Sequence, residues 1–375
     1  MRMKSKKTSQ HGLTIIEFMI SIVLGLIAVA AAGTATYLSQ KNYTNQEAMA
    51  RLQENGRIAM QMLSYDIRMA GFFGCVDEIE SITDHVVGGA GSLFEAKALE
   101  GLEFDDPTWY PSGEPHANVS NVVLSTDTDG ILVKFLSPDT NVAVEEPYMP
   151  NRAGVIHVSP NNVLNQGDIV AVTDCDTADI FQITTKGSGG GNTVPLGHAT
   201  GGNVSPGNLS PVPCQGNKHC MSKTYEEDSF ILKFVAVRYL ISDGPNGPAL
   251  LREQLANDGG NSIVVAREMV QGIENMQIRY GEDTDNDRIP DAYRSADDVA
   301  SWDNVISVRI GLLARSMAQT RFGTAGEYGG AEDIDTRSYD LDGDGVKGGA
   351  EDPDVADDRV IRHEFVSTVF IRNLR

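Results

Sequence analysis

An apolar run near the N-terminus constrains this chain more than any other feature. Residues 13–38 read LTIIEFMISIVLGLIAVAAAGTATYL and contain one charged side chain, that of Glu17. At about 1.5 Å per residue, a helix of this length crosses a hydrocarbon core of about 30 Å. The charged residues that precede the run are all basic: Arg2, Lys4, Lys6 and Lys7. This charge pattern predicts a single membrane span with the bulk of the chain outside the cytoplasm.

Three interpretations of the apolar run compete. Ala28, Ala30 and Ala32 offer cleavage sites for an ordinary secretory signal, and the length of the run also suits a permanent anchor. Neither interpretation accounts for Glu17. An unpaired carboxylate inside a membrane helix costs about 2.5–3.5 kcal/mol on insertion scales.

The third interpretation explains Glu17. A basic leader that ends in Gly12, followed by an apolar helix with an early glutamate, resembles the type III signal of type IV prepilins. The resemblance implies that prepilin peptidase cuts between Gly12 and Leu13 and that Leu13 is then N-methylated, although the family usually has phenylalanine there. The carboxylate of Glu17 would then pair with the α-amino group of a neighbouring subunit in a filament.

The chain is predicted to continue as one helix beyond the membrane. No proline occurs between residues 13 and 71, and a recurring apolar stripe is formed by Ala48, Leu52, Ala59, Leu63 and Ile67. We expect a leader at 1–12, a membrane or filament-core helix at 13–38 and an amphipathic helix at 39–71. The expected head has two β-rich parts, 72–185 and 214–375, separated by an exposed Gly/Ser/Pro loop at 186–213.

Short apolar runs bounded by turn residues predict the strands of the head. They occupy residues 131–136, 154–158, 168–173, 230–241, 262–266, 273–280, 303–314 and 361–372. One long helix followed by many strands indicates an α+β, pilin-like fold, with the helix packed on an antiparallel β-rich globular head.

A second resemblance is more specific. Residues 51–75 read RLQENGRIAMQMLSYDIRMAGFFGC, and GIENMQIRYGEDTDNDRIPDAY, WDNVISVRIGLLARS and the final FIRN follow in the C-terminal half. These segments are similar to the PilW family of minor pilins. The resemblance implies a protein that joins other minor pilins and the major pilin to initiate, prime or cap a type IV pilus. It further implies an inner-membrane anchor, a periplasmic head, and a role in twitching motility and adhesion.

A calcium loop is the sharpest chemical signal in the sequence. Residues 340–351 read DLDGDGVKGGAE and match the spacing of an EF-hand loop. The predicted ligands are the side chains of Asp340, Asp342, Asp344 and Glu351 and the carbonyl of Val346. No clear helices flank the loop, so we expect an isolated calcium site.

A second acidic segment, DTDNDRIPD, has similar spacing. It resembles thrombospondin-type calcium repeats, and its predicted ligands are Asp283, Asp285, Asp287, Ile289 and Asp291. Arg288 stands where the turn glycine is usual, and Arg294 stands at the twelfth position in place of glutamate. The alternative is an acidic turn that binds no ion.

Four cysteines in an exported chain predict two disulfides. Cys214 and Cys220 are close enough to close a small loop, which leaves Cys75 and Cys175. A zinc site built from Cys214, His219 and Cys220 is the alternative, but it lacks a second ligand cluster.

The net charge and the absence of catalytic motifs in the sequence bear on two further classes of function, nucleic-acid binding and catalysis. The formal net charge is −22, and binding nucleic-acid phosphates requires clustered basic residues, so no nucleic acid is expected as a partner. The chain has no Walker loop, HExxH or GxSxG motif, and we expect a non-enzyme. Two alternatives remain beside the PilW interpretation: a type II secretion pseudopilin, and a calcium-dependent adhesin or binding module on a plain membrane anchor.

Overall fold

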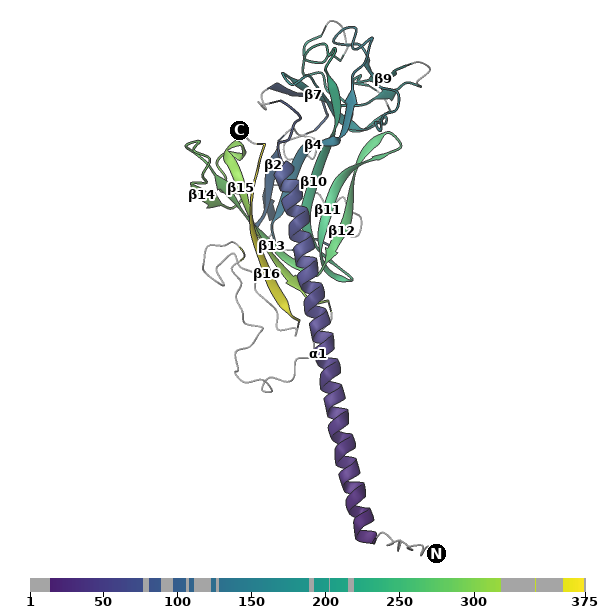
Figure 1. Ribbon diagram of the computed structural model, residues 1–375. Coiled ribbons are helices and arrows are strands. Elements are labelled where there is room, and N and C mark those ends of the chain that lie inside the picture. The colour runs from purple at the N-terminus through teal and green to yellow at the C-terminus, as the bar shows by residue number, and fades with distance from the viewer. Residues whose placement is uncertain are drawn as a thin grey trace, which may run out of the picture.

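The computed structural model shows a rod-like helix that projects from a body made of strands (Figure 1). It describes residues 14–76, 81–88, 97–105, 108–110, 123–125, 128–188, 192–201, 203–214, 219–317, 341 and 360–373.

Helix α1 (Ile15–Met69) is continuous over its whole length. Thr14 caps its N-terminus, because the Thr14 hydroxyl accepts a hydrogen bond from the Glu17 N–H while the Glu17 carboxylate accepts one from the Thr14 N–H. After the helix, Gly71 adopts a φ of 72°, the left-handed conformation that ends many helices. The N-terminal half extends away from the body, and the C-terminal half lies against the strands (Figure 1).

The strands form three sheets. The largest has the order β1 (Ile82–Asp84), β7 (Ala178–Gln182), β6 (Ile169–Thr173), β10 (Phe230–Gly244), β4 (Gly130–Ala143), β2 (Leu99–Asp105) and β3 (Thr108–Tyr110). The long hairpin of β11 (Gly247–Asp258) and β12 (Asn261–Gln271) extends this sheet from β10. A second sheet contains β14 (Ala292–Arg294), β13 (Ile273–Glu282), β15 (Val305–Arg315) and β16 (Arg362–Phe370). The third contains β5 (Ile156–Val158), β9 (Val194–Gly197) and β8 (Thr185–Lys186).

The main core lies where α1 meets the first two sheets. Leu52, Ala59, Leu63 and Ile67 recur every four or seven residues and are almost fully buried. They share one cluster with side chains of β4 and β10 and with side chains of β13 and β15. Burial of a large aliphatic side chain contributes about 1.5–3 kcal/mol, so this stripe accounts for the docking of the helix.

A separate core fills the end of the body farthest from the N-terminus (Figure 1). We call this end of the body the distal lobe; it comprises residues 81–88 and the described residues between 144 and 225. Its centre is apolar and includes Ile156, Leu164, Phe181, Leu196 and Tyr225. The lobe is joined to the rest of the body by β6, which pairs with β10.

The prediction of an α+β fold with an antiparallel head is wrong. Beyond α1, the described residues are dominated by strands, and a 3₁₀ turn at Trp302–Asn304 precedes β15. The strands are divided among several sheets, and β1 pairs with β7 in parallel. The protein is therefore a multi-sheet β body carried by one helix. Local apolar patterns indicate where strands lie but not which strand each will pair with, and this explains the error.

The segment 186–213 also differs from the expected exposed loop. It contains β9, and both His198 and Asn208 are buried. Asn208 donates from its amide to the carbonyl oxygen of Gln182 and accepts from the Gln182 N–H. The described part of this segment thus contributes to the folded distal lobe.

Gly56 is required by the close approach of α1 to the last strand. A Cβ atom at this position would lie 2.6 Å from Cδ2 of Phe365, and closer still to the outer ring carbons. We expect Gly56→Ala to destabilise the body by about 1–3 kcal/mol, because the Phe365 ring must move within a packed core. Thermal melts of the full chain in detergent measure the effect.

Gly33→Ala is the matched control, because Gly33 lies in the same helix with no atom near its missing Cβ. Alanine favours helix, so the control should be neutral or mildly stabilising. Phe365→Leu should partly restore the stability of Gly56→Ala. A Gly56→Ala protein that melts at or above the wild-type temperature would contradict this account.

Candidate assembly surface and cation-binding loop

The N-terminal half of α1 is an uncovered apolar surface. Its hydropathy suffices for a membrane span, and none of that apolar window is buried against the body. Ile15 is 80% exposed and Phe18 is 61% exposed. A surface of this size requires a lipid or protein partner in water.

The carboxylate of Glu17 lies at the tip of this surface. Its Oε2 atom is 3.3 Å from the Thr14 nitrogen, so the negative charge sits at the positive end of the helix dipole. Gly12 and Leu13, the predicted cleavage and methylation residues, lie outside the described residues. Within the described chain, the helix terminus itself is the electrostatic partner of Glu17.

The C-terminal half of α1 is fastened to the body by polar contacts as well as by its apolar stripe. Asn55 donates from its amide to the carbonyl oxygen of Gln271 at 3.0 Å. At the end of the helix, the amide of Asn373 donates to the carbonyl oxygen of Arg68 at 3.2 Å. Both ends of the amphipathic segment are thereby tied to the C-terminal half of the sequence.

A buried polar contact between α1 and the large sheet involves Asp66. This buried carboxylate accepts a hydrogen bond of 2.6 Å from the Tyr239 hydroxyl, and the Arg252 guanidinium lies 3.2 Å away. Burial and the neighbouring Asp66 charge raise the pKa of Tyr239, so the hydroxyl stays protonated and donates. Removing one member of such a group leaves the others buried without a partner.

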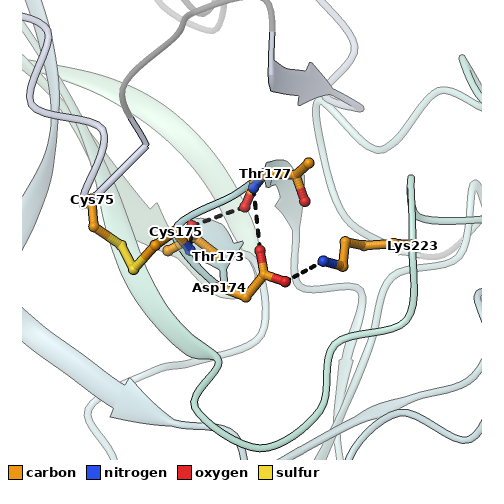
Figure 2. The surroundings of a disulfide bond; sticks show 6 residues. All are labelled: Cys75, Thr173, Asp174, Cys175, Thr177 and Lys223. Atoms are coloured by element: carbon orange, nitrogen blue, oxygen red, sulfur yellow. Dashed lines mark hydrogen bonds and ion pairs between the residues drawn. A yellow bond between two sulfur atoms is a disulfide. The ribbon is translucent and has the colours of Figure 1, made fainter.

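Two disulfides are present, as the cysteine count predicts. Cys75, just after α1, is bonded to Cys175 in the turn between β6 and β7. The Thr173 hydroxyl supports that turn by donating to the Thr177 carbonyl and accepting from the Cys175 N–H, and Asp174 pairs with Lys223 (Figure 2). The bond closes a loop of 100 residues, and chain entropy assigns about 4.7 kcal/mol to a loop of this length.

The second disulfide joins Cys214 and Cys220. This pairing removes the thiolates that the alternative zinc site would need. His219 instead points into the distal lobe, where its Nδ1 atom lies 2.7 Å from Nδ1 of His198.

The acidic loop after β13 brings three of the predicted calcium ligands together. Among the described residues, Asp283, Asp285 and Asp287 are the group whose carboxylate oxygens all lie within 4.8 Å of one another. The Asp287 N–H lowers the pKa of Asp285, but the charges of Asp287, Asp291 and Asp283 outweigh it, so the pKa is raised. Such crowding of like charge favours a bound cation.

The backbone of this loop compensates for the missing glycine. Arg288 occupies the position that glycine usually takes and adopts a φ of 68°. Its N–H donates to the Asp283 carboxylate at 2.8 Å, which holds the turn in place. Asp291, by contrast, accepts hydrogen bonds from the N–H and hydroxyl of Thr284 and is not part of the three-carboxylate group. Ile289 donates from its N–H to the Asp287 carboxylate.

The other predicted calcium loop falls almost wholly outside the described residues. Asp340, Asp342, Asp344, Val346 and Glu351 belong to that part of the chain. Leu341 is described and is fully buried, in contact with Leu313 on β15. Its carbonyl lies over Gly311, where any side chain would collide with it.

A comparison of the sequence with models of known protein families found a match in the C-terminal half of the chain. Residues 238–373 match the model of a family described as type IV pilus-assembly protein W, PilW. The resemblance to the PilW family is confirmed. The matched PilW segment begins within β10 and ends just after β16, and it supplies residues that contact α1, among them Tyr239, Arg252 and Phe365. No curated protein and no solved structure matches the chain.

The structure also identifies contacts that sequence reasoning missed. The contact between Asp66 and Arg252 joins residues far apart in the chain, so the sequence does not show which residue Asp66 pairs with. Its place within the buried stripe, one residue before Ile67, was the available signal, because a charged residue on the core side of a helix requires a partner. The approach of His198 to His219 was likewise missed, because the sequence offered His219 only as part of the alternative zinc site.

Proposed function

We propose that this protein is a minor pilin that joins other minor pilins and the major pilin to initiate, prime or cap a type IV pilus. One observation carries the proposal: a single helix presents an uncovered apolar half and buries its other half in a head that includes the PilW segment. The family supports a role in pilus assembly, and the two-part helix supplies the means. Twitching motility and adhesion would then depend on the protein through the pilus.

Processing and location follow from the same proposal. Prepilin peptidase removes residues 1–12, Leu13 becomes the methylated N-terminus, and the apolar half of α1 holds the protein in the inner membrane with its head in the periplasm. On assembly, the apolar half exchanges lipid for the helices of other subunits. Glu17 then pairs with the amino terminus of a neighbour, and this attraction offsets the cost of burying its charge.

Calcium is the proposed structural ion of the head. The group of Asp283, Asp285 and Asp287 supports one site, and the spacing of residues 340–351 supports another. A divalent cation would relieve the mutual repulsion of these carboxylates. Its contribution to the head is stabilisation, with no chemical step.

Cleavage after Gly12 separates a minor pilin from an adhesin on a plain anchor. Gly12→Ala should leave the full-length form in the membrane, because the peptidase requires the glycine. Ala30→Leu, which alters only the alternative signal-peptidase site, should not change the mature mass. Intact mass spectrometry of the membrane protein measures the mature mass of both variants. A mature N-terminus after Ala30 or Ala32 would exclude prepilin processing.

Glu17 tests assembly. Glu17→Ala should remain in the membrane, because it removes a charge that is costly in lipid, yet its recovery in complex with other minor pilins should fall by at least about tenfold. Glu47→Ala is the control, since Glu47 is an exposed acid farther along α1, paired with Arg51. Equal recovery of wild type and Glu17→Ala in co-purification would show that Glu17 has no partner in another subunit.

Calcium should raise the melting temperature of the full chain in detergent. An ion that binds the folded state at a hundredfold excess over Kd stabilises it by about 2.7 kcal/mol. Asp342→Ala should remove most of this increment and Asp285→Asn a smaller part, while the exposed Asp298→Asn, outside both loops, should leave it intact. Melts that are the same with calcium and with chelator would remove calcium from this account.

A further inference from the structure

The distal lobe contains a buried cluster of histidines. Three of the seven histidines in the chain gather there, and His85 is 0% exposed while His198 and His219 are each 4% exposed. The ring centroids of His85 and His219 are 4.7 Å apart, and those of His198 and His219 are 5.0 Å apart. They come from three separate segments, so the cluster ties distant parts of the lobe together.

Asp179 on β7 anchors one side of the cluster. Its carboxylate accepts a 2.6 Å hydrogen bond from His85 Nε2, a 2.7 Å bond from the Tyr225 hydroxyl, and bonds from the N–H and hydroxyl of Ser222. Burial alone would raise the pKa of Asp179, but these donors outweigh it and lower the pKa. The aspartate is therefore ionised, and the Nε2 atom of His85 carries the proton of their contact.

The partners of the other two rings determine where their protons lie. His198 Nε2 is 2.8 Å from the Gly154 carbonyl oxygen and must donate to it. With His198 neutral, its Nδ1 atom is unprotonated and accepts a hydrogen bond of 2.7 Å from the protonated Nδ1 atom of His219. His219 Nε2 is left as a lone pair, and it has no hydrogen-bond partner within the described chain. The contact between the two Nδ1 atoms has room for one proton, so the two rings cannot both be cationic while the lobe stays closed.

An added proton would place a positive charge in this site. Burial first, and then the charges of His198 and His85, lower the pKa of His219 to about 3. Burial likewise lowers the pKa of His198, although the hydrogen bond to the Gly154 carbonyl acts to raise it. The counter-charge of Asp179 and the backbone of Leu209 favour protonation of His219 but do not prevail. Tyr225 is bonded to Asp179, and the outer charged groups, Arg152 and Lys223, are held by Met221 and Asp174.

We propose that this histidine cluster makes the distal lobe an acid-sensitive unit, closed near neutral pH and opened when the surroundings fall to about pH 5. A histidine with a lowered folded-state pKa contributes stability above its unfolded value of about 6.5 and loses it as the pH falls. Between pH 7.5 and 5.0, each histidine that stays neutral in the closed lobe shifts the opening equilibrium by about 30-fold.

Hydrogen exchange of the full chain in detergent, with chelator present at both pH values, tests the proposal. After correction for the intrinsic exchange rate, peptides of β7, β9 and residues 219–225 should lose at least about 30-fold in protection between pH 7.5 and 5.0. Peptides of β13 and β15, remote from the cluster, should lose much less. Equal losses in both sets, or no loss in the lobe, would overturn the proposal.

Substitutions assign the effect to the cluster. His219→Gln and His198→Gln keep a polar neutral side chain that takes up no proton, and each should reduce the pH-dependent loss by about 30-fold. His157→Gln is the matched control, because His157 lies in the same lobe on β5 and contacts Thr193 instead of the cluster. If a glutamine variant shows no protection from hydrogen exchange in the lobe at pH 7.5, that variant is unfolded there and is set aside. The proposal is then tested by the wild-type protein alone, through the comparison of lobe peptides with those of β13 and β15. An undiminished loss in folded His219→Gln and His198→Gln would refute the proposal.

Discussion

The close contact of α1 with the C-terminal strands is the constraint on which the rest of the structure depends. Gly56 allows the Phe365 ring to lie against the helix, and Asp66 binds Tyr239 and Arg252 a few turns later. Two sheets that share few strand contacts are thereby brought around one helix. The segment that matches the PilW family forms one side of this interface, and the buried stripe of α1 forms the other.

The parts of the fold that follow local rules could be predicted from the sequence. The apolar run and the stripe ending at Ile67 lie in one helix, and the runs 131–136 and 230–241 lie inside β4 and β10. The pairing of β1 with β7 could not be predicted, because it joins residues about a hundred positions apart through a short polar strand. The same reason applies to His85, His198 and His219, which belong to no motif and meet only after folding.

The candidate sites also differ in how far the sequence predicts them, according to whether their contacts are local or depend on the folded backbone. The acidic loop is one short segment, so the spacing of Asp283, Asp285 and Asp287 already implied that their carboxylates converge. Its departure at Arg288 is tolerated because the backbone N–H of that residue binds Asp283 and offsets the strain of a positive φ. Sequence spacing did not show that Asp291 would instead bind Thr284, because that preference depends on the conformation of the closed turn.

The bond between Cys75 and Cys175 has a mechanical consequence. A pull on the N-terminal end of α1 is transmitted along a helix without a break, and at its far end the load reaches a covalent link into the turn between β6 and β7. Tension therefore enters the head at two places at once: through the buried stripe of α1 that packs on the sheets, and through the disulfide. The strands β2 to β4 lie between the two cysteines in the sequence and are bypassed by the load, so the distal lobe moves with the helix even where those strands yield.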